Sequence, residues 1–185
     1  MRTLIVTEFV TLDGVMEAPG GEPTHPHSGW VMPFVGEEQM AYKLAETLEA
    51  ESMLLGRVTY EGFAAAWPSM EGVFADKMNS MPKHVASTTL REAEWNATVI
   101  DGDVPAAVAA LKASDGGPIL VAGSGTLVHT LLRNGLVDEL RLMEFPVSIG
   151  AGLRVFPEEQ TKLTWQRTER IEFSTGVTVS HYAPV

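Results

Sequence analysis

Small and hydroxyl-bearing residues follow an apolar run at Gly123-Ser124-Gly125-Thr126. The run 119–122 precedes them, and leucines at helical spacing come after them. A helix that begins here offers backbone N–H groups without partners and the positive end of its dipole. Because no bulky side chain stands in the way, a phosphate could approach those donors closely. Taken alone, the motif is more typical of a helix cap whose glycines permit tight packing.

An arginine and a threonine mark a second junction of this kind, in the segment LLGRVTYEGF (54–63). A strand ends at Gly56, and Arg57 falls in the first turn of a helix, where the dipole disfavours a cation. A bound anion would explain Arg57, with Thr59 as a further donor. A salt bridge from Arg57 to Glu61, four residues on, is the alternative.

Three consecutive hydroxyls form a third junction in KHVASTTLRE, at Ser87, Thr88 and Thr89. A helix cap or a turn explains them when they are taken alone. Three polar strand ends in one sheet, however, suit a ligand with several phosphates, such as a dinucleotide. The G-x-G-x-x-G and G-x-x-x-x-G-K-[ST] patterns are both absent, so the sequence predicts neither an ordinary Rossmann site nor a P-loop.

These junctions need an alternating series of strands and helices to position them. Apolar and β-branched runs predict strands at 3–10, 52–56, 83–88, 97–101, 118–122 and 138–150, and a hairpin at 163–183. Helical spacing predicts helices at 36–51, 57–67 and 104–114, and another after 125. The sequence therefore predicts an α/β fold in one domain, with a mostly parallel central sheet, helices on both faces and antiparallel C-terminal strands. In such sheets ligands bind at the carboxyl ends of the strands.

Composition limits the classes of function. The 185 residues carry a formal charge of −11, which disfavours binding to nucleic acid or to anionic membranes. No cysteine is present, and His25 and His27 lack further ligands nearby, so we expect no metal site. The first residues do not resemble a signal peptide and no apolar run reaches membrane-spanning length. We expect a cytoplasmic protein with a small-molecule substrate.

The order of the motifs resembles the dihydrofolate reductase superfamily. TLDG follows the first strand, then come GRVTYEGF, KHVAST and LVAGSGTLVHTLL, and finally LVDELRLMEFPVSIGAGLRVF. The branch that contains the reductase domain of bacterial riboflavin biosynthesis, with its free-standing relatives, is the most similar. The resemblance covers nearly the whole chain. It implies a dihydrofolate reductase-like fold, NADPH as cofactor and a homodimer.

The resemblance also implies which residues hold NADPH. Those at the pyrophosphate and the 2′-phosphate are Gly56, Arg57, Val58, Thr59, Ser87, Thr88, Thr89, Gly123, Ser124, Gly125, Thr126 and Leu127. Arg57 would distinguish NADPH from NADH through the 2′-phosphate. The first peptide of the glycine motif is cis in dihydrofolate reductases, which predicts a cis bond between Gly123 and Ser124.

Two departures from the dihydrofolate reductase pattern make folate an improbable substrate. Met40 stands nearest to the position of the carboxylate that supports protonation, and Val128 replaces a tyrosine. Glu8 is a candidate catalytic acid if it is buried, and a partly solvated strand residue otherwise. Asp13 is a second candidate, with a turn residue as its alternative.

Thr7, Phe9 and Trp30 are the predicted substrate contacts. Together these features predict hydride transfer from NADPH to a small heterocycle or to a carbonyl or imine, as in the pyrimidine reductase of the riboflavin pathway. The rival hypothesis is a module that binds NADP(H) without turnover, as a sensor or a sequestering protein.

Overall fold

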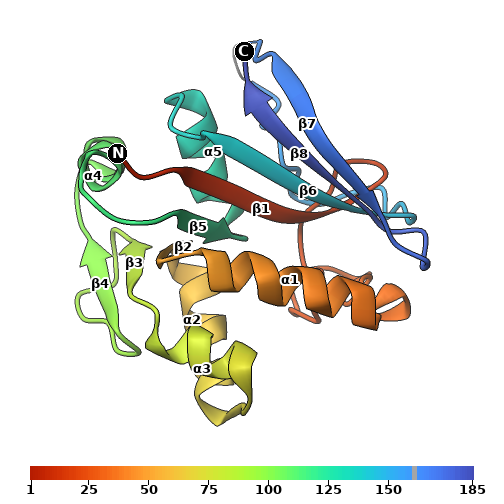
Figure 1. The fold of residues 1–185 in the computed structure, drawn as a ribbon, viewed down its shortest axis with the longest axis horizontal. Coiled ribbons are helices and arrows are strands. Elements are labelled where there is room, and N and C mark those ends of the chain that lie inside the picture. Colours follow the sequence, from red (N-terminus) through yellow and green to blue (C-terminus); the bar gives the residue numbers. More distant parts are fainter. Residues whose placement is uncertain (160–161) are drawn as a thin grey trace.

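One mixed sheet organises the protein, in the strand order β4-β3-β2-β5-β1-β6-β8-β7 (Figure 1). The computed structural model describes residues 1–159 and 162–185. The strands are β1 Leu4–Thr11, β2 Ser52–Gly56, β3 Lys83–Ala86, β4 Ala97–Ile100, β5 Ile119–Ala122, β6 Glu139–Phe145, β7 Trp165–Glu172 and β8 Thr178–Pro184. The pairs among β1 to β6 are parallel, and β8 runs antiparallel to both β6 and β7. The predicted fold class is confirmed.

Five α-helices connect the strands. They are α1 Glu37–Glu49, α2 Arg57–Ala66, α3 Val73–Ser80, α4 Val104–Ala113 and α5 Gly125–Arg133. Two short 3₁₀ turns, Met32–Phe34 and Trp67–Ser69, accompany them. Helix α3, which follows Gly72 at a positive φ of 100°, was not predicted from the sequence. No helix in the described part of the chain is long and apolar enough to cross a membrane.

Alternating side chains of the central strands fill a separate apolar core on each face of the sheet. Leu4 and Val6 of β1 pack in a cluster with residues of α4 and α5. Ile5, between them, packs on the other side in a cluster with residues of α2 and α3. This alternation is the period of two that a strand imposes. It also determines on which face of the sheet each later side chain of β1 lies. Thr7 therefore lies on the side of Ile5, and Glu8 on the side of Val6.

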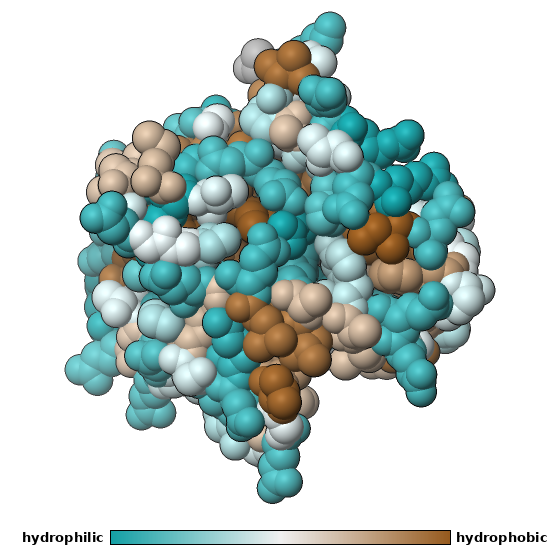
Figure 2. Space-filling view, in the orientation of Figure 1, coloured by the Kyte–Doolittle hydropathy of each residue, from teal (hydrophilic) through white to brown (hydrophobic). Residues whose placement is uncertain are grey.

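Helix α1 turns its polar side inward. Gln39, Glu46 and Thr47 are each only 3% exposed, whereas Met40 and Leu48 are 48% and 47% exposed. The apolar spacing that predicts this helix therefore marks part of its outer side. The molecular face in Figure 2 is mostly hydrophilic, with separate apolar patches. The inward polar side of α1 lies over the charged and hydroxyl-bearing residues of the sheet that form the site.

Candidate functional site

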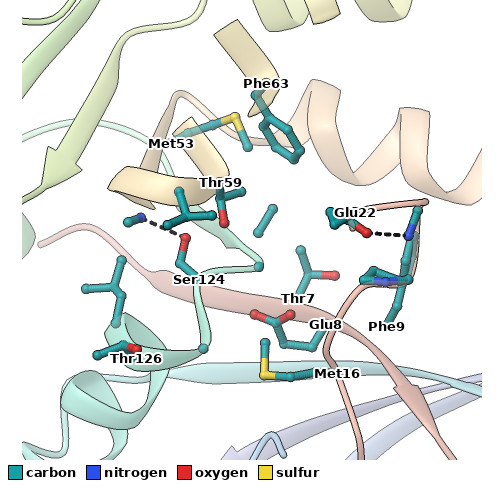
Figure 3. A pocket seen from close by; sticks show the side chains of 18 of the residues that line it. Thr7, Glu8, Phe9, Met16, Glu22, Met53, Thr59, Phe63, Ser124 and Thr126 are labelled. Atoms are coloured by element: carbon teal, nitrogen blue, oxygen red, sulfur yellow. Dashed lines mark hydrogen bonds between the residues drawn. The ribbon is translucent and has the colours of Figure 1, made fainter. Parts of the chain in front are cut away.

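A cavity of about 1100 Å³ opens at the carboxyl ends of β1, β2, β3 and β5 (Figure 3). All three predicted junctions line it. Their lining residues are Gly56, Arg57, Val58, Thr59, Ser87, Thr88, Thr89, Gly123, Ser124, Gly125, Thr126 and Leu127. Segments separated by tens of residues in the sequence thus meet in one wall. The parallel strand order accounts for this, because the carboxyl ends of parallel strands share one edge of a sheet.

The first two junctions are joined directly. The backbone N–H of Gly56 donates to Ser124 Oγ at 2.7 Å (Figure 3). A Cβ atom on Gly56 would lie 3.0 Å from Ser124 Cβ, which is closer than side chains normally approach. The close contact between the two junctions therefore favours glycine at position 56. Serine at position 124 supplies the acceptor that fixes their spacing.

The glycine turn reverses the chain through two left-handed residues. Gly123 has φ of +65° and Ser124 has φ of +72°. Every peptide bond in the described residues is trans, so the predicted cis bond between Gly123 and Ser124 is wrong. The two positive φ angles provide the turn for which the cis bond was expected. Gly125 has a packing role, because a Cβ atom there would collide with Leu153.

Two helices begin at this wall without a side-chain cap. In the described structure neither Gly56, the N-cap of α2, nor Ser124, the N-cap of α5, makes a side-chain bond to its helix. The first-turn N–H groups of a helix need such partners, and an anion can provide them. The wall can therefore accept phosphate oxygens at two points.

Arg57 pairs with Glu61 in the structure. Its Nη1 lies 2.8 Å from Glu61 Oε2, and the two side chains are 43% and 48% exposed. This is the salt bridge that the sequence offered as an alternative to an anion site. An exposed i,i+4 pair contributes only about 0.3–0.5 kcal/mol. Because Arg57 also lines the cavity, it can exchange Glu61 for a ligand phosphate at little cost.

The hydroxyls of the third junction play two parts. Ser87 Oγ accepts the backbone N–H groups of Thr89 at 3.2 Å and Leu90 at 2.9 Å, so it fixes a turn. Thr88 and Thr89 are exposed residues that line the cavity. The turn holds these two hydroxyls at the end of β3, where they can donate to a ligand.

A buried carboxyl group also lines the cavity. Glu8 is 4% exposed, and its Oε1 has no hydrogen-bond partner among the described residues. Burial raises the pKa of Glu8 well above its usual value. Lys43 opposes this shift in pKa, and Glu46 reinforces it. Glu8 is therefore the buried acid of the sequence analysis, and its carboxyl group stays protonated over a wider pH range than an exposed one.

Three cavity residues from α1 were missed by the sequence analysis: Gln39, Lys43 and Thr47. Lys43 Nζ donates to Thr7 Oγ1 at 3.0 Å and lies 5.3 Å from the centroid of the Phe9 ring. Thr7 and Phe9 also line the cavity, as expected of substrate contacts. The three polar residues are four apart and so share one side of the helix, but their polarity gave no sign that this side faces inward.

Asp13 and Trp30 are not among the described residues that line the cavity. Asp13 accepts the Thr11 hydroxyl at 2.6 Å and the Gly150 N–H at 2.7 Å, and these bonds lower its pKa. It is the turn residue of the alternative interpretation. Trp30 is 6% exposed, donates its indole N–H to Glu17 O at 2.8 Å and packs edge-on against Phe145. Its ring packs in the apolar core and does not line the cavity, so Trp30 is not placed as the substrate contact that the sequence predicted.

One family model matches the chain, and solved structures share its fold. The family model of the RibD C-terminal domain matches residues 2–179. The uncharacterised Bacillus subtilis protein YyaP is 28% identical over 183 residues, covering 95% of this chain and 92% of YyaP. A putative riboflavin biosynthesis protein from Shewanella sp. PV-4 superposes with a TM-score of 0.75 at 18% identity, covering 99% of both chains. Dihydrofolate reductase from Enterococcus faecalis, complexed with NADP(H), superposes with a TM-score of 0.63 at 16% identity, covering 98% of this chain and 96% of that one.

Proposed function

The chain belongs to the RibD C-terminal domain family, and from that premise we propose that it is a reductase that uses NADPH. The proposed reaction is hydride transfer to a small heterocycle or to a carbonyl or imine. One observation carries the proposal: three phosphate-compatible junctions converge on a single cavity. The structurally similar Enterococcus faecalis enzyme, which is complexed with NADP(H), supports the choice of cofactor.

The cavity has the size and the donors that a dinucleotide requires. Its volume of about 1100 Å³ exceeds that of most small-ligand pockets. The two uncapped helix starts, at Gly56 and Ser124, would hold the pyrophosphate. Arg57, with the hydroxyls of Thr88 and Thr89, would hold the 2′-phosphate that distinguishes NADPH from NADH.

The substrate would lie at the end formed by Thr7, Glu8, Phe9 and Lys43. When bound, NADPH supplies the hydride, and the protein orients the reactants and supplies the electrostatic environment. A protonated Glu8 can donate a hydrogen bond to the oxygen or nitrogen of the substrate double bond, which polarises that bond towards hydride addition. The apolar ring of Phe9 shields this end from water.

A fluorescence titration with NADPH and NADH tests the proposal, with the intrinsic tryptophans as the reporter. Arg57→Ala should weaken NADPH binding by about 10- to 150-fold, which corresponds to losing a charge-assisted hydrogen bond of about 1.5–3 kcal/mol. NADH should bind weakly to both proteins. Arg170→Ala is the matched control, because Arg170 forms a comparable exposed ion pair with Glu172 at 2.9 Å on the edge strand β7.

Failure of the parent protein to bind NADPH would refute the proposal. Equal weakening by the two arginine substitutions would refute the role of Arg57. Tight NADPH binding without oxidation by any pterin, pyrimidine, carbonyl or imine compound would favour the binding module that the sequence analysis set against a reductase.

A further inference from the structure

A chain of hydrogen-bonded groups begins at the cavity and passes behind α1. At the cavity, Lys43 Nζ donates to Thr7 Oγ1 at 3.0 Å. The same ammonium group donates to Oε2 of Glu46, whose side chain is only 1% exposed. Glu46 Oε1 in turn accepts the Tyr42 hydroxyl at 3.4 Å. The chain thus crosses from the cavity wall to the buried side of α1.

The outer half of the chain reaches the surface through β8. Tyr42 Oη lies 2.8 Å from His181 Nε2. On the other side of the ring, His181 Nδ1 lies 3.1 Å from Glu139 Oε1 and 3.3 Å from Glu169 Oε2. The side chain of Glu169 is 54% exposed on β7, so this end meets solvent. Each consecutive pair from Thr7 to Glu169 is in contact.

A buried arginine lies among the neighbouring carboxylates. Arg141 lies opposite His181 in the register of β6 and β8. Its guanidinium is 3.6 Å from Glu46, 3.0 Å from Glu49 and 2.7 Å from Glu139. The hydrogen bond from His181, followed by that from Arg141, lowers the pKa of Glu139 to about 2. The charged and titratable groups that face His181 are therefore Glu139, Glu169, Arg141 and Tyr42.

Tyr42 is suited to pass a proton without becoming charged. Its burial raises the pKa of its hydroxyl above the ordinary value, with Glu46 acting in the same direction. A neutral hydroxyl can accept a proton from one neighbour while it gives its own to another. Tyr42 is thus an intermediate between His181 and Glu46.

We propose that Lys43, Glu46, Tyr42 and His181 form a proton path that connects the cavity with solvent and replaces the proton that reduction removes. This rests on the proposed function. Hydride transfer from NADPH adds two electrons and one hydrogen to the substrate, and the oxygen or nitrogen of the reduced double bond then needs one proton. Lys43 gives that proton from its ammonium group and becomes a neutral amine.

The path restores Lys43 in a balanced series of transfers. His181 gives its Nε2 proton to Tyr42 Oη, the Tyr42 proton passes to Oε1 of Glu46, and rotation of the Glu46 carboxyl group carries that proton to Lys43. His181 is left with its proton on Nδ1; rotation of the ring turns that proton towards Tyr42, and the vacated nitrogen, now on the side of Glu169, takes a new proton from water. The net uptake is one proton from solvent for each hydride transferred.

The path is needed when ligands fill the cavity, because water then has no direct access to Lys43. A dinucleotide and a substrate would displace water from the front of Lys43, whose side chain is already only 16% exposed. Glu8 has no comparable connection, because its Oε1 is unpartnered among the described residues. A proton lost from Glu8 could not return through the protein, whereas one lost from Lys43 can.

Proton exchange at Lys43 tests the path directly. The measurement is the rate at which the ¹⁵N-labelled Nζ hydrogens of Lys43 exchange with water, by NMR, with and without NADPH. Tyr42→Phe removes the hydroxyl but retains the ring, and it should slow exchange severalfold in the NADPH complex. Tyr182→Phe is the matched control, because Tyr182 follows His181 in the sequence of β8 but is not part of the proton path. It should leave the rate unchanged.

A second variant distinguishes proton relay from a purely structural role. His181→Gln keeps an amide group that can hydrogen-bond to Tyr42 but cannot relay a proton, and it should also slow exchange. Equal rates in the parent, Tyr42→Phe and His181→Gln overturn the path, whether or not NADPH is bound. NADPH affinity, titrated separately for each variant, tests the proposed function, so the two failures are distinguishable.

Discussion

Replacing Glu8 with glutamine should stabilise the protein against unfolding at neutral pH. Glu8 is 4% exposed, and its buried Oε1 has no partner among the described residues. Burial raises its pKa well above 4.5, the value expected in the unfolded chain. Between these two pKa values the unfolded chain has released a proton that the folded protein retains. The stability of the parent therefore falls as pH rises through this window.

The size of the effect follows from the width of that window. Each pH unit within it lowers the free energy of unfolding of the parent by about 1.4 kcal/mol. Glutamine has nearly the shape of glutamic acid and does not titrate. The advantage of Glu8→Gln should thus be small near pH 4 and grow by about 1.4 kcal/mol for each pH unit between the unfolded and folded pKa values of Glu8. For a chain of this length, each kcal/mol corresponds to roughly 2–4 °C in Tm.

Urea unfolding followed by tryptophan fluorescence, at intervals from pH 4 to pH 7, measures this difference. Glu92→Gln is the control, because it removes one carboxylate from an exposed position. A stability difference between Glu8→Gln and the parent that stays constant with pH would refute the reasoning. It would mean that Glu8 ionises at the same pH in the folded and unfolded chains.

Three further substitutions have defined outcomes. Burial lowers the pKa of Lys83 from 10.5 to about 8, so the parent should gain roughly 3 kcal/mol of stability between pH 8 and pH 10.5, and Lys83→Met should abolish that gain in urea titrations. Gly123→Ala places a side chain at φ of +65° and 3.3 Å from Thr59 Oγ1; it should cost about 1–2 kcal/mol, and an unchanged Tm would contradict the turn described here. Arg141→Met removes the guanidinium that contacts Glu46, Glu49 and Glu139, while Lys43 still pairs with the buried Glu46; it should cost about 1.5–3 kcal/mol in urea unfolding, whereas a loss below about 1 kcal/mol would show that the cluster contributes little.

The convergence of the three junctions on one wall of the cavity could be predicted because their signals are local. Gly56, Ser87 and Gly123 each stand where a strand pattern gives way to a helix or a turn, and parallel pairing brings such ends together. The conformation of the glycine turn was beyond prediction, because a cis bond and two left-handed residues both reverse the chain. Only the backbone angles of Gly123 and Ser124 distinguish these alternatives.

The end of the cavity proposed for the substrate was harder to predict because it depends on which side of α1 faces inward. Polar residues on an amphipathic helix normally face water, so Gln39, Lys43 and Thr47 would be assigned to the surface. The structure buries that side because Thr7 and Arg141 on the sheet provide partners for it. Trp30 was misplaced for a related reason: a loop rich in glycine and proline gives no sign that one of its side chains enters a core.

The position of β5 between β2 and β1 dictates when the protein can become competent during synthesis. The first 118 residues include four of the strands. Strands β1 and β2 are joined only through β5, so they stay separate until Ile119–Ala122 pairs with both. A nascent chain that stops before β5 leaves two apolar strand edges open, which favours capture by chaperones or aggregation. The bond from Gly56 to Ser124 forms only after that insertion. Dinucleotide binding would therefore appear late, and abruptly, as the chain leaves the ribosome.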